Sequence, residues 1–253
     1  LVQMKDSTMS LHFINFAYDA QGRSFSLIQM NHGKFYLQDS IIRNVVLDTM
    51  PIIQVIATDT ETLNNKYTNN TNVIINRTQI LNVTKSPITI PRMEHIVELL
   101  SYRYTFSDNP LILAKQKRIG GVVFVANPTR LDIRDSYFED IINTPVAFFS
   151  ESADVNYNSR VKSHIYFYNS TFRNLSFTMG PALTVIPNTY SPFININNCT
   201  FDTVQAEAGG AMSVYNSSLY MTASHIFNYR ANLIAPAILV GGASRASSHF
   251  DLT

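Results

Sequence analysis

The chain has 253 residues, a formal net charge of +1, 45% hydrophobic residues and only 15% charged residues. This length suits one large domain, and the balanced charge without a Lys/Arg run excludes a nucleic-acid-binding protein and a basic membrane-surface protein. The longest apolar runs have the length of strands, so no transmembrane segment is predicted. A single cysteine excludes an intrachain disulfide bond.

The first 34 residues precede any clear repeat. Within them, residues 11–18 form a mainly apolar run of strand length. We expect residues 1–34 to be an N-terminal cap or a partial coil of the structure that follows. The start at Leu1 in place of Met, without the form of a signal peptide, and the abrupt end at Thr253 favour a fragment of a longer chain.

From residue 35 onward, six segments of eleven residues share one pattern. Positions one and three are large and apolar and alternate with mostly polar residues at positions two and four, which indicates a strand with one buried face. Position six is Ser, Thr or Cys, position eight is Ile or Phe, and position ten is Asn, Asp or Thr. The segments begin at Phe35, Val73, Leu131, Ile165, Ile194 and Leu219.

A repeated unit of this kind cannot bury its apolar face alone, so the units must stack on one another. The residues at position eight are then expected to lie above one another inside the stack. This predicted core ladder consists of Ile42, Ile80, Phe138, Phe172, Phe201 and Ile226.

After each repeat a second short apolar segment follows. These segments begin with Pro or Gly, which suits strand starts because proline lacks the amide proton of a ladder bond. They begin at Pro51, Pro87, Pro145, Pro181, Gly210 and Pro236. An extra copy begins at Gly121. Because 58 residues separate Ile80 from Phe138, we expect residues 99–106 and this extra strand to form an additional, degenerate coil.

These features predict an all-β fold, a right-handed single-stranded parallel β-helix (a solenoid) of about seven coils with loop insertions. Residues 1–253 would form a single domain in which residues 35–240 carry the repeats. Residues 241–253 are expected to be a linker or a continuation. The Asn-rich and Ser-rich stretches 61–71 and 150–163 are expected to be external loops.

Two motifs resemble a known family. Asn198-Cys-Thr-Phe201 and Gly209-Gly-Ala-Met-Ser-Val214 resemble the paired repeat signatures of polymorphic outer-membrane adhesins and of the wider pectin-lyase-like superfamily of β-helices. The step from the apolar residue to Asn in Phe172-Arg-Asn174 is two residues rather than the three of the adhesins. The resemblance spans residues 35–240 and implies the architecture, but this fold carries several functions.

Enzymes of this superfamily cleave acidic polysaccharides with clustered carboxylates, or with Lys or Arg and bound calcium. General acid–base catalysis needs two groups that face one substrate, and all the best candidate carboxylates lie in a single repeat. The six histidines show no metal-ligand spacing. We therefore predict a non-enzymatic protein without metal or cofactor. A polysaccharide lyase or hydrolase, or a carbohydrate-binding module, is the alternative. The candidate carboxylates are Asp132, Asp135, Glu139 and Asp140.

Four tyrosines occupy outward-pointing positions two and four of the repeats. Aromatic faces stack on sugars and dominate protein interfaces, so these rings form a candidate platform for a polysaccharide or a protein. The alternative is that they only reflect the preference of tyrosine for exposed strands. They are Tyr36, Tyr166, Tyr168 and Tyr220.

Seven sequons for N-glycosylation occur in the chain. We expect Asn69, Asn76 and Asn216 to be accessible. Position five includes Arg77, which implies exposure, so Asn169 and Asn198 at this position are further candidates. The two sequons at position ten, Asn82 and Asn174, indicate either glycans or an internal polar ladder that satisfies backbone groups.

The function expected from these patterns is a non-enzymatic structural or adhesive module, extracellular or on the cell surface. N-linked glycans, neighbouring domains, further copies of the chain and polysaccharide are its expected partners. Assembly of copies would produce a fibre, filament or coat. The lone Cys199 shares position six with serines and threonine, so it is interpreted as a small filler and not as a nucleophile.

Overall fold

The computed structural model describes residues 2–19, 26–47, 50–56, 71–85, 121–126, 130–150, 163–186, 192–234, 237–241 and 249–252. Within these residues every regular element is a strand, and all strand pairs are parallel. The described part of the chain contains no helix of the length and apolarity that a membrane span requires. The prediction of an all-β fold with long parallel sheets is confirmed for these residues.

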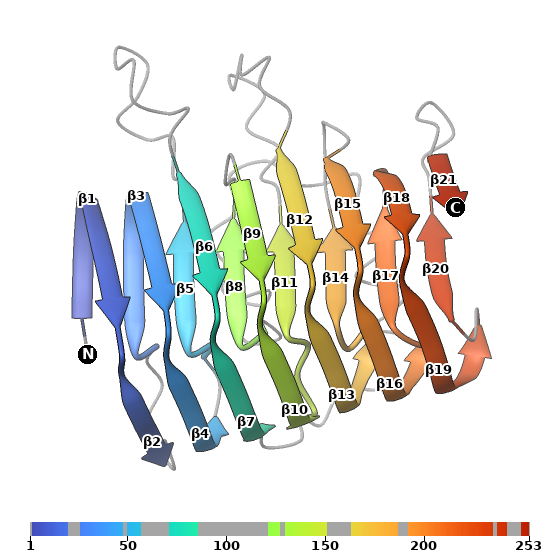
Figure 1. The fold of residues 1–253 in the computed structure, drawn as a ribbon, viewed down its shortest axis with the longest axis horizontal. Coiled ribbons are helices and arrows are strands. Elements are labelled where there is room, and N and C mark those ends of the chain that lie inside the picture. Colours follow the sequence, from blue (N-terminus) through green and yellow to red (C-terminus); the bar gives the residue numbers. More distant parts are fainter. Residues whose placement is uncertain are drawn as a thin grey trace.

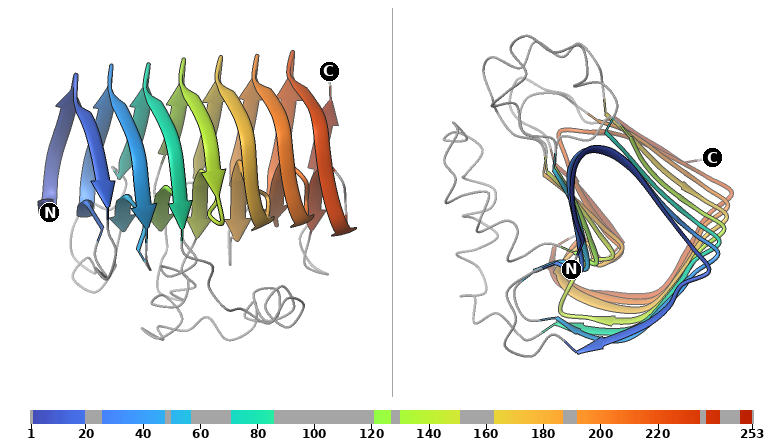
Figure 2. Two further views of the ribbon diagram at one scale, coloured as in Figure 1. Left: turned by 90° about the horizontal axis from the view of Figure 1, so that it is seen from below. Right: turned by 90° about the vertical axis from the view of Figure 1, so that its left-hand side faces the viewer.

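The strands form three stacks (Figures 1 and 2). The first stack contains β5 (Ile53–Ile56), β8 (Val123–Ala126), β11 (Ala147–Ser150), β14 (Leu183–Ile186), β17 (Met212–Tyr215) and β20 (Ile238–Gly241). The second contains β6 (Asn72–Asn76), β9 (Arg130–Arg134), β12 (His164–Tyr168), β15 (Phe193–Asn197), β18 (Ser218–Thr222) and β21 (His249–Leu252). The third contains β2 (Asn15–Asp19), β4 (Ile41–Leu47), β7 (Gln79–Lys85), β10 (Tyr137–Ile142), β13 (Thr171–Met179), β16 (Thr200–Ala208) and β19 (His225–Ile234).

Two longer strands, β1 (Val2–His12) and β3 (Ile28–Gln38), run through the first and the second stack. The beginning of β3 pairs with β5 and its end pairs with β6, which joins these two stacks into one sheet of 14 strands. The third stack is a separate sheet of 7 strands. From β3 to β21 the chain visits the second, third and first stack in that repeating order. This arrangement is consistent with a parallel β-helix.

The residues at position eight lie next to one another in the third stack. Ile42 pairs with Ile80, Ile80 with Phe138, and the register continues through Phe172, Phe201 and Ile226. The rings of Phe138, Phe172 and Phe201 stack with centroids 5.1 and 4.9 Å apart. All but Ile226 are fully buried, so aromatic stacking adds to hydrophobic burial along the centre of the molecule.

Position six forms a second internal column, made of hydroxyl groups. The Ser136 hydroxyl donates to the carbonyl of Arg134 and accepts the amide of Thr78 from the row before. The Ser170 hydroxyl repeats the arrangement with Tyr168 and Ser136. These bonds satisfy backbone groups that each turn leaves unpaired, which explains why small hydroxyl residues recur at this position.

The additional coil expected between Ile80 and Phe138 is wrong. β7 pairs directly with β10, and β5 pairs directly with β8, so no row lies between them. The extra strand that begins at Gly121 is the first-stack strand of the row that contains β7. The long step in the sequence is an insertion between β7 and β8. Residues 99–106 and the segment that begins at Pro87 lie outside the described residues.

Strands also occur before and after the predicted repeats. β1 and β2 pair with β3 and β4, and Phe16 lies beside Ile42, so residues 2–19 form a row of the same kind as those that follow. At the other end β21 pairs with β18, with Phe250 beside Leu219. The third stack reaches 7 strands because β2 contributes one of them.

Candidate functional site

The outward side chains of β3, β6, β9, β12, β15 and β18 form one surface, which we call the second-stack face. Along β6, β15 and β18, partly exposed and buried residues alternate, as the period of two predicts. The register places residues from successive rows side by side: Tyr36, Ile74, Asp132, Tyr166, Asn195 and Tyr220. The predicted tyrosines are therefore not one stripe, because Ile74 and Asp132 separate Tyr36 from Tyr166.

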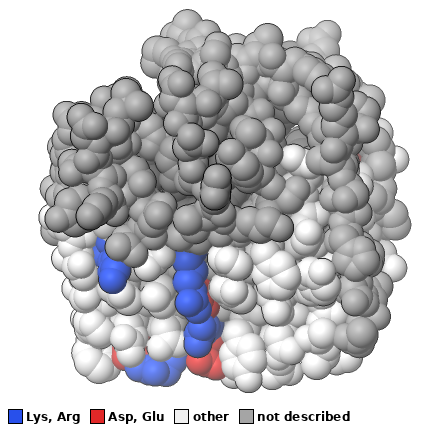
Figure 3. All heavy atoms as spheres, turned by 90° about the horizontal axis from the view of Figure 1, so that it is seen from above, with Lys and Arg blue, Asp and Glu red and all other residues white. Residues whose placement is uncertain are grey.

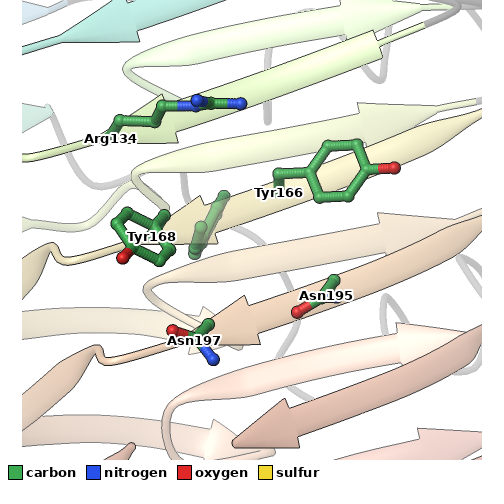
Figure 4. Close-up of a pocket in the computed structure, with 6 residues that line it drawn as sticks. Arg134, Tyr166, Tyr168, Asn195 and Asn197 are labelled. Atoms are coloured by element: carbon green, nitrogen blue, oxygen red, sulfur yellow. The ribbon is translucent and has the colours of Figure 1, made fainter.

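An open pocket of about 320 Å³ lies on this face across β9, β12 and β15 (Figure 4). Its rim combines two aromatic rings, one guanidinium group and two carboxamides. The Tyr168 ring is among the most exposed large apolar groups of the described residues, with 49% of its surface accessible. The lining residues are Arg134, Tyr166, Phe167, Tyr168, Asn195 and Asn197.

A buried carboxylate holds the guanidinium group of the pocket. Asp132 is only 1% exposed, and its two oxygens accept hydrogen bonds from Nε and Nη2 of Arg134 at 2.7 and 2.8 Å. Arg130 binds the same carboxylate through Nε at 3.1 Å, and its guanidinium carbon lies 4.9 Å from the centre of the Tyr166 ring. The bond to Asp132 raises the pKa of Arg134. Arg130 and Arg134 thus share one buried carboxylate, and the exposed Asp135 adds a second negative charge near Arg134.

Charged residues make up only 15% of the chain. On the face seen in Figure 3, the Lys, Arg, Asp and Glu side chains of the described residues form narrow strips within a mostly uncharged surface. The pocket itself combines the guanidinium group of Arg134 with aromatic and amide groups.

Two further rings extend the aromatic surface. His164 lies parallel to Tyr166, with ring centroids 5.8 Å apart and Nδ1 3.2 Å from the tyrosine oxygen. Phe193 lies 5.8 Å from His164 and 5.0 Å from Tyr220. Sequence reasoning missed both residues because they stand one position before the repeat. The alternation that places position two outward also places this position outward, so the signal was present.

The four candidate carboxylates do not face one site. Asp132 lies on the second-stack face, whereas Asp135 lies in the turn that follows and accepts a bond from Asn169 Nδ2 at 2.6 Å. Glu139 lies in the third stack, with an oxygen 3.5 Å from Nη1 of Arg173. Asp140 lies within β10 at a left-handed φ of 56° and accepts a bond from Asn174 Nδ2 at 2.5 Å. One repeat contains two strands, a turn between them and a left-handed residue within the second strand, so residues close in sequence point in different directions.

Two positions of each repeat adopt the left-handed backbone conformation: position five, in the turn between the strands, and position ten, within the third-stack strand. The φ angles lie between 45° and 52° at position five and between 49° and 56° at position ten. Asn and Asp tolerate this region better than most residues, which explains their recurrence there. At position ten, Asn82 donates from Nδ2 to Asn44 Oδ1 at 2.8 Å. The predicted polar ladder exists, but it is on the surface and not internal.

The sequons differ in their surroundings. Asn82, Asn169, Asn174 and Asn198 are exposed, and each donates a hydrogen bond from Nδ2 to the row before. Asn76 is half-buried on the second-stack face, between Gln38 and Arg134. Asn69 lies outside the described residues.

The expected accessibility of Asn216 is wrong. Only 5% of its surface is exposed, because it lies in the turn between β17 and β18. Its backbone amide donates to the Gly241 carbonyl at 2.7 Å, so the following row of the first stack packs against this turn.

Cys199 belongs to the internal column at position six. Its Sγ lies 3.4 Å from the Asn197 carbonyl, and burial raises the pKa of the thiol to about 11. A thiol with this pKa is not a thiolate nucleophile at neutral pH. Within the described residues, no group of three or more His, Cys, Asp and Glu side chains is arranged to hold a metal ion.

No protein-family model, no curated protein and no solved structure matches the chain. The function of the protein is therefore inferred from the geometry of the second-stack face.

Proposed function

We propose that the protein is an extracellular, non-enzymatic adhesive module that binds carbohydrate through the second-stack face. The observation that carries the proposal is the pocket in which the exposed Tyr168 ring, the Arg134 guanidinium and the Asn195 carboxamide surround one open space. A sugar ring has an apolar C–H face and a rim of hydroxyl groups. Aromatic rings suit the first, while guanidinium and amide groups suit the second.

The site is held in place before a ligand arrives. Asp132 fixes Arg134 through two hydrogen bonds, and Asn197 donates from Nδ2 to Thr222 Oγ1 at 2.5 Å. The strands beneath these side chains are bonded to neighbours on both sides. Binding then requires little ordering of side chains, which favours affinity for a weakly apolar ligand such as a sugar.

The proposal includes a right-handed β-helix of about seven coils, of the pectin-lyase-like kind. It is supported by the regular order of the three stacks and by the 7 strands of the third one. The low content of charged residues and the sequons support an extracellular location. Assembly of copies into a fibre, filament or coat stays a prediction of the sequence.

Titration calorimetry of the purified chain against a panel of neutral and acidic polysaccharides tests the proposed function. We expect at least one to bind, and we expect Tyr168→Ala to weaken its affinity about tenfold or more, the loss of about 1.4 kcal/mol or more of stacking. Tyr36→Ala is the matched control, because Tyr36 lies on the same face three rows away, and it should bind as the wild type does.

Equal affinity of the two variants, or no binding to any polysaccharide, would refute the proposal. The same samples are assayed for new reducing ends and for the absorbance of unsaturated products. We expect neither signal, and release of cleaved polysaccharide would favour the lyase or hydrolase alternative.

A further inference from the structure

The turn at position five places two sequons in adjacent rows. Asn169-Ser-Thr171 follows β12, and Asn198-Cys-Thr200 follows β15. Both asparagines are exposed and have φ angles of 46° and 52°. The backbone amide of Asn169 donates to the Asn197 carbonyl at 3.0 Å, so these two turns stack directly on each other. Adjacent parallel rows lie about 4.8 Å apart, which is a short distance for two bulky glycans.

The side chain of Asn169 is bonded to the row on each side. Its Nδ2 donates to the carboxylate of Asp135 at 2.6 Å, and its Oδ1 accepts a bond from Asn198 Nδ2 at 3.0 Å. The first of these bonds is charge-assisted and is the stronger one. A glycan on Nδ2 of Asn169 would have to emerge between Asp135 and Asn198 and would disturb both bonds.

Asn198 has a neighbour of this kind on one side only. Its backbone amide donates to the Thr222 carbonyl at 3.1 Å, so the following row is in register with it. Position five of that row is Ala223, which also has a left-handed φ of 48°. The methyl group of Ala223 therefore leaves room beside Asn198, where the larger side chain of Asp135 fills the corresponding space beside Asn169. The bond that Asn198 Nδ2 donates goes to the neutral carboxamide of Asn169.

We propose that Asn198 is the N-glycan acceptor of this column and that Asn169 is an unmodified structural residue. This inference rests on the extracellular location in the proposed function. A glycan on Asn198 leaves the bond between Asn169 and Asp135 intact. The space beside Ala223 allows the Asn198 side chain to turn away from Asn169, and only the neutral bond to Asn169 opposes this rotation. The glycan would emerge at the turn beside the second-stack face.

Two threonine variants test this without changing either asparagine. Thr171 and Thr200 are the hydroxyl residues of the two sequons, and they pair with each other in the third stack, where both are partly exposed. Thr200→Val and Thr171→Val therefore make the same change in neighbouring and similar environments, and each removes one sequon while it keeps a β-branched side chain.

The chain and both variants are expressed in a secreting eukaryotic host, and the intact mass is measured before and after glycosidase treatment. We expect Thr200→Val to lose one glycan and Thr171→Val to lose none. Loss of a glycan in Thr171→Val, or no loss in Thr200→Val, would overturn the inference. If Thr200→Val is not secreted, Asn198→Gln replaces it and must lose the same single glycan.

The test of the acceptor site and the test of carbohydrate binding can fail separately. Carbohydrate binding is measured on protein made in bacteria, which carries no N-glycan. A negative polysaccharide panel with the expected loss of mass in Thr200→Val would reject the binding face and keep the acceptor site. The reverse pattern would reject the acceptor site alone.

Discussion

The first and second stacks share the same parallel ladder but have opposite outer surfaces. In the second stack, buried and partly exposed residues alternate along β6, β15 and β18. In the first stack, all four residues of β5, β8 and β17 are buried. The rings of Phe124 and Phe148, from neighbouring first-stack strands, stack with centroids 5.7 Å apart. The hydrogen-bonded ladder is the same in both stacks. The outward-pointing side chains differ: they are partly exposed in the second stack and buried in the first, so the second stack has a free surface for a ligand.

The sequence carries a signal for this difference. The first-stack strand β8 belongs to a continuous apolar run, Val-Val-Phe-Val at residues 122–125, which is typical of strands buried on both faces. The first-stack strands β5, β14 and β17 contain one polar residue each, Gln54, Thr184 and Ser213, and these side chains are buried as well. Second-stack strands alternate, as in Phe-Ile-Asn-Ile-Asn at residues 193–197. A ligand site is therefore expected on the alternating strands, where polar and aromatic groups reach solvent.

The largest effect should come from an outward ring of the first stack. Phe148 is fully buried, so Phe148→Ala should lower the free energy of unfolding by about 3–5 kcal/mol through lost burial and a cavity. Tyr168→Ala, on the second-stack face, should change it by about 0.5 kcal/mol or less. Denaturant unfolding followed by circular dichroism measures both. Similar losses in the two variants would contradict the difference between the stacks.

A smaller effect is expected at the carboxylate beneath the pocket. Asp132→Ala should lower the free energy of unfolding by about 1–3 kcal/mol, because Arg130 and Arg134 lose the group that they share. Polysaccharide affinity should fall as well, since Arg134 is no longer held. Glu139→Ala is the control from the third stack, where an exposed ion pair contributes about 0–1 kcal/mol. A stable Asp132→Ala variant with full affinity would show that the carboxylate does not organise the pocket.

Two aspartates whose carboxylates accept hydrogen bonds from the next row should make stability depend on acid. The hydrogen bond from Arg77 lowers the pKa of Asp39 below its ordinary value of 3.8, and the bond from Asn228 does the same for Asp202. A lowered folded-state pKa gives stability that is fully present above the unfolded value and is lost as the pH falls through the folded one. The melting temperature should therefore decline below about pH 4, and it should decline less in Asp39→Asn. If the melting temperature of this variant declines with acid as that of the wild type does, the carboxylate of Asp39 does not contribute to the pH dependence of stability.

The smallest effect is expected in the internal column at position six. Cys199→Ser should change the free energy of unfolding by less than about 1 kcal/mol, because a hydroxyl at this position serves the neighbouring rows. In the native protein, burial raises the pKa of the thiol to about 11, so alkylation at mildly alkaline pH should wait for unfolding. Mass spectrometry of native and denatured samples measures this. Rapid modification of the native thiol would mean that the column is open.

The spacing of apolar residues was sufficient to predict the rows, because each side chain in a ladder lies beside its counterpart in the next repeat. The pairing of Phe138 with Phe172 and of Phe172 with Phe201 follows directly from this spacing. The left-handed backbone conformation at positions five and ten is also reflected in the sequence, because Asn and Asp recur at these positions. Their role was missed because sequence alone does not distinguish a residue that adopts this conformation from one that supplies a buried hydrogen bond.

Other features depend on which rows become neighbours. A coil was predicted between β7 and β10 because residues 99–106 and the extra strand at Gly121 fill a long step between repeats. The pairings of β7 with β10 and of β5 with β8 exclude it. The burial of Asn216 depends on Gly241 in the following row, which no local pattern reveals. The pocket likewise unites residues from three rows, β9, β12 and β15. Tyr168 could be chosen from its outward position, but its proximity to Arg134 and Asn195 could not.

A crystal structure of the chain with a fragment of its tightest-binding polysaccharide tests the binding face most directly. We expect a sugar ring in van der Waals contact with the Tyr168 ring, with their carbon atoms about 4 Å apart and with the sugar hydroxyl groups hydrogen-bonded to Arg134 and Asn195. A fragment bound instead on the third stack, or at the turns away from this pocket, would contradict it.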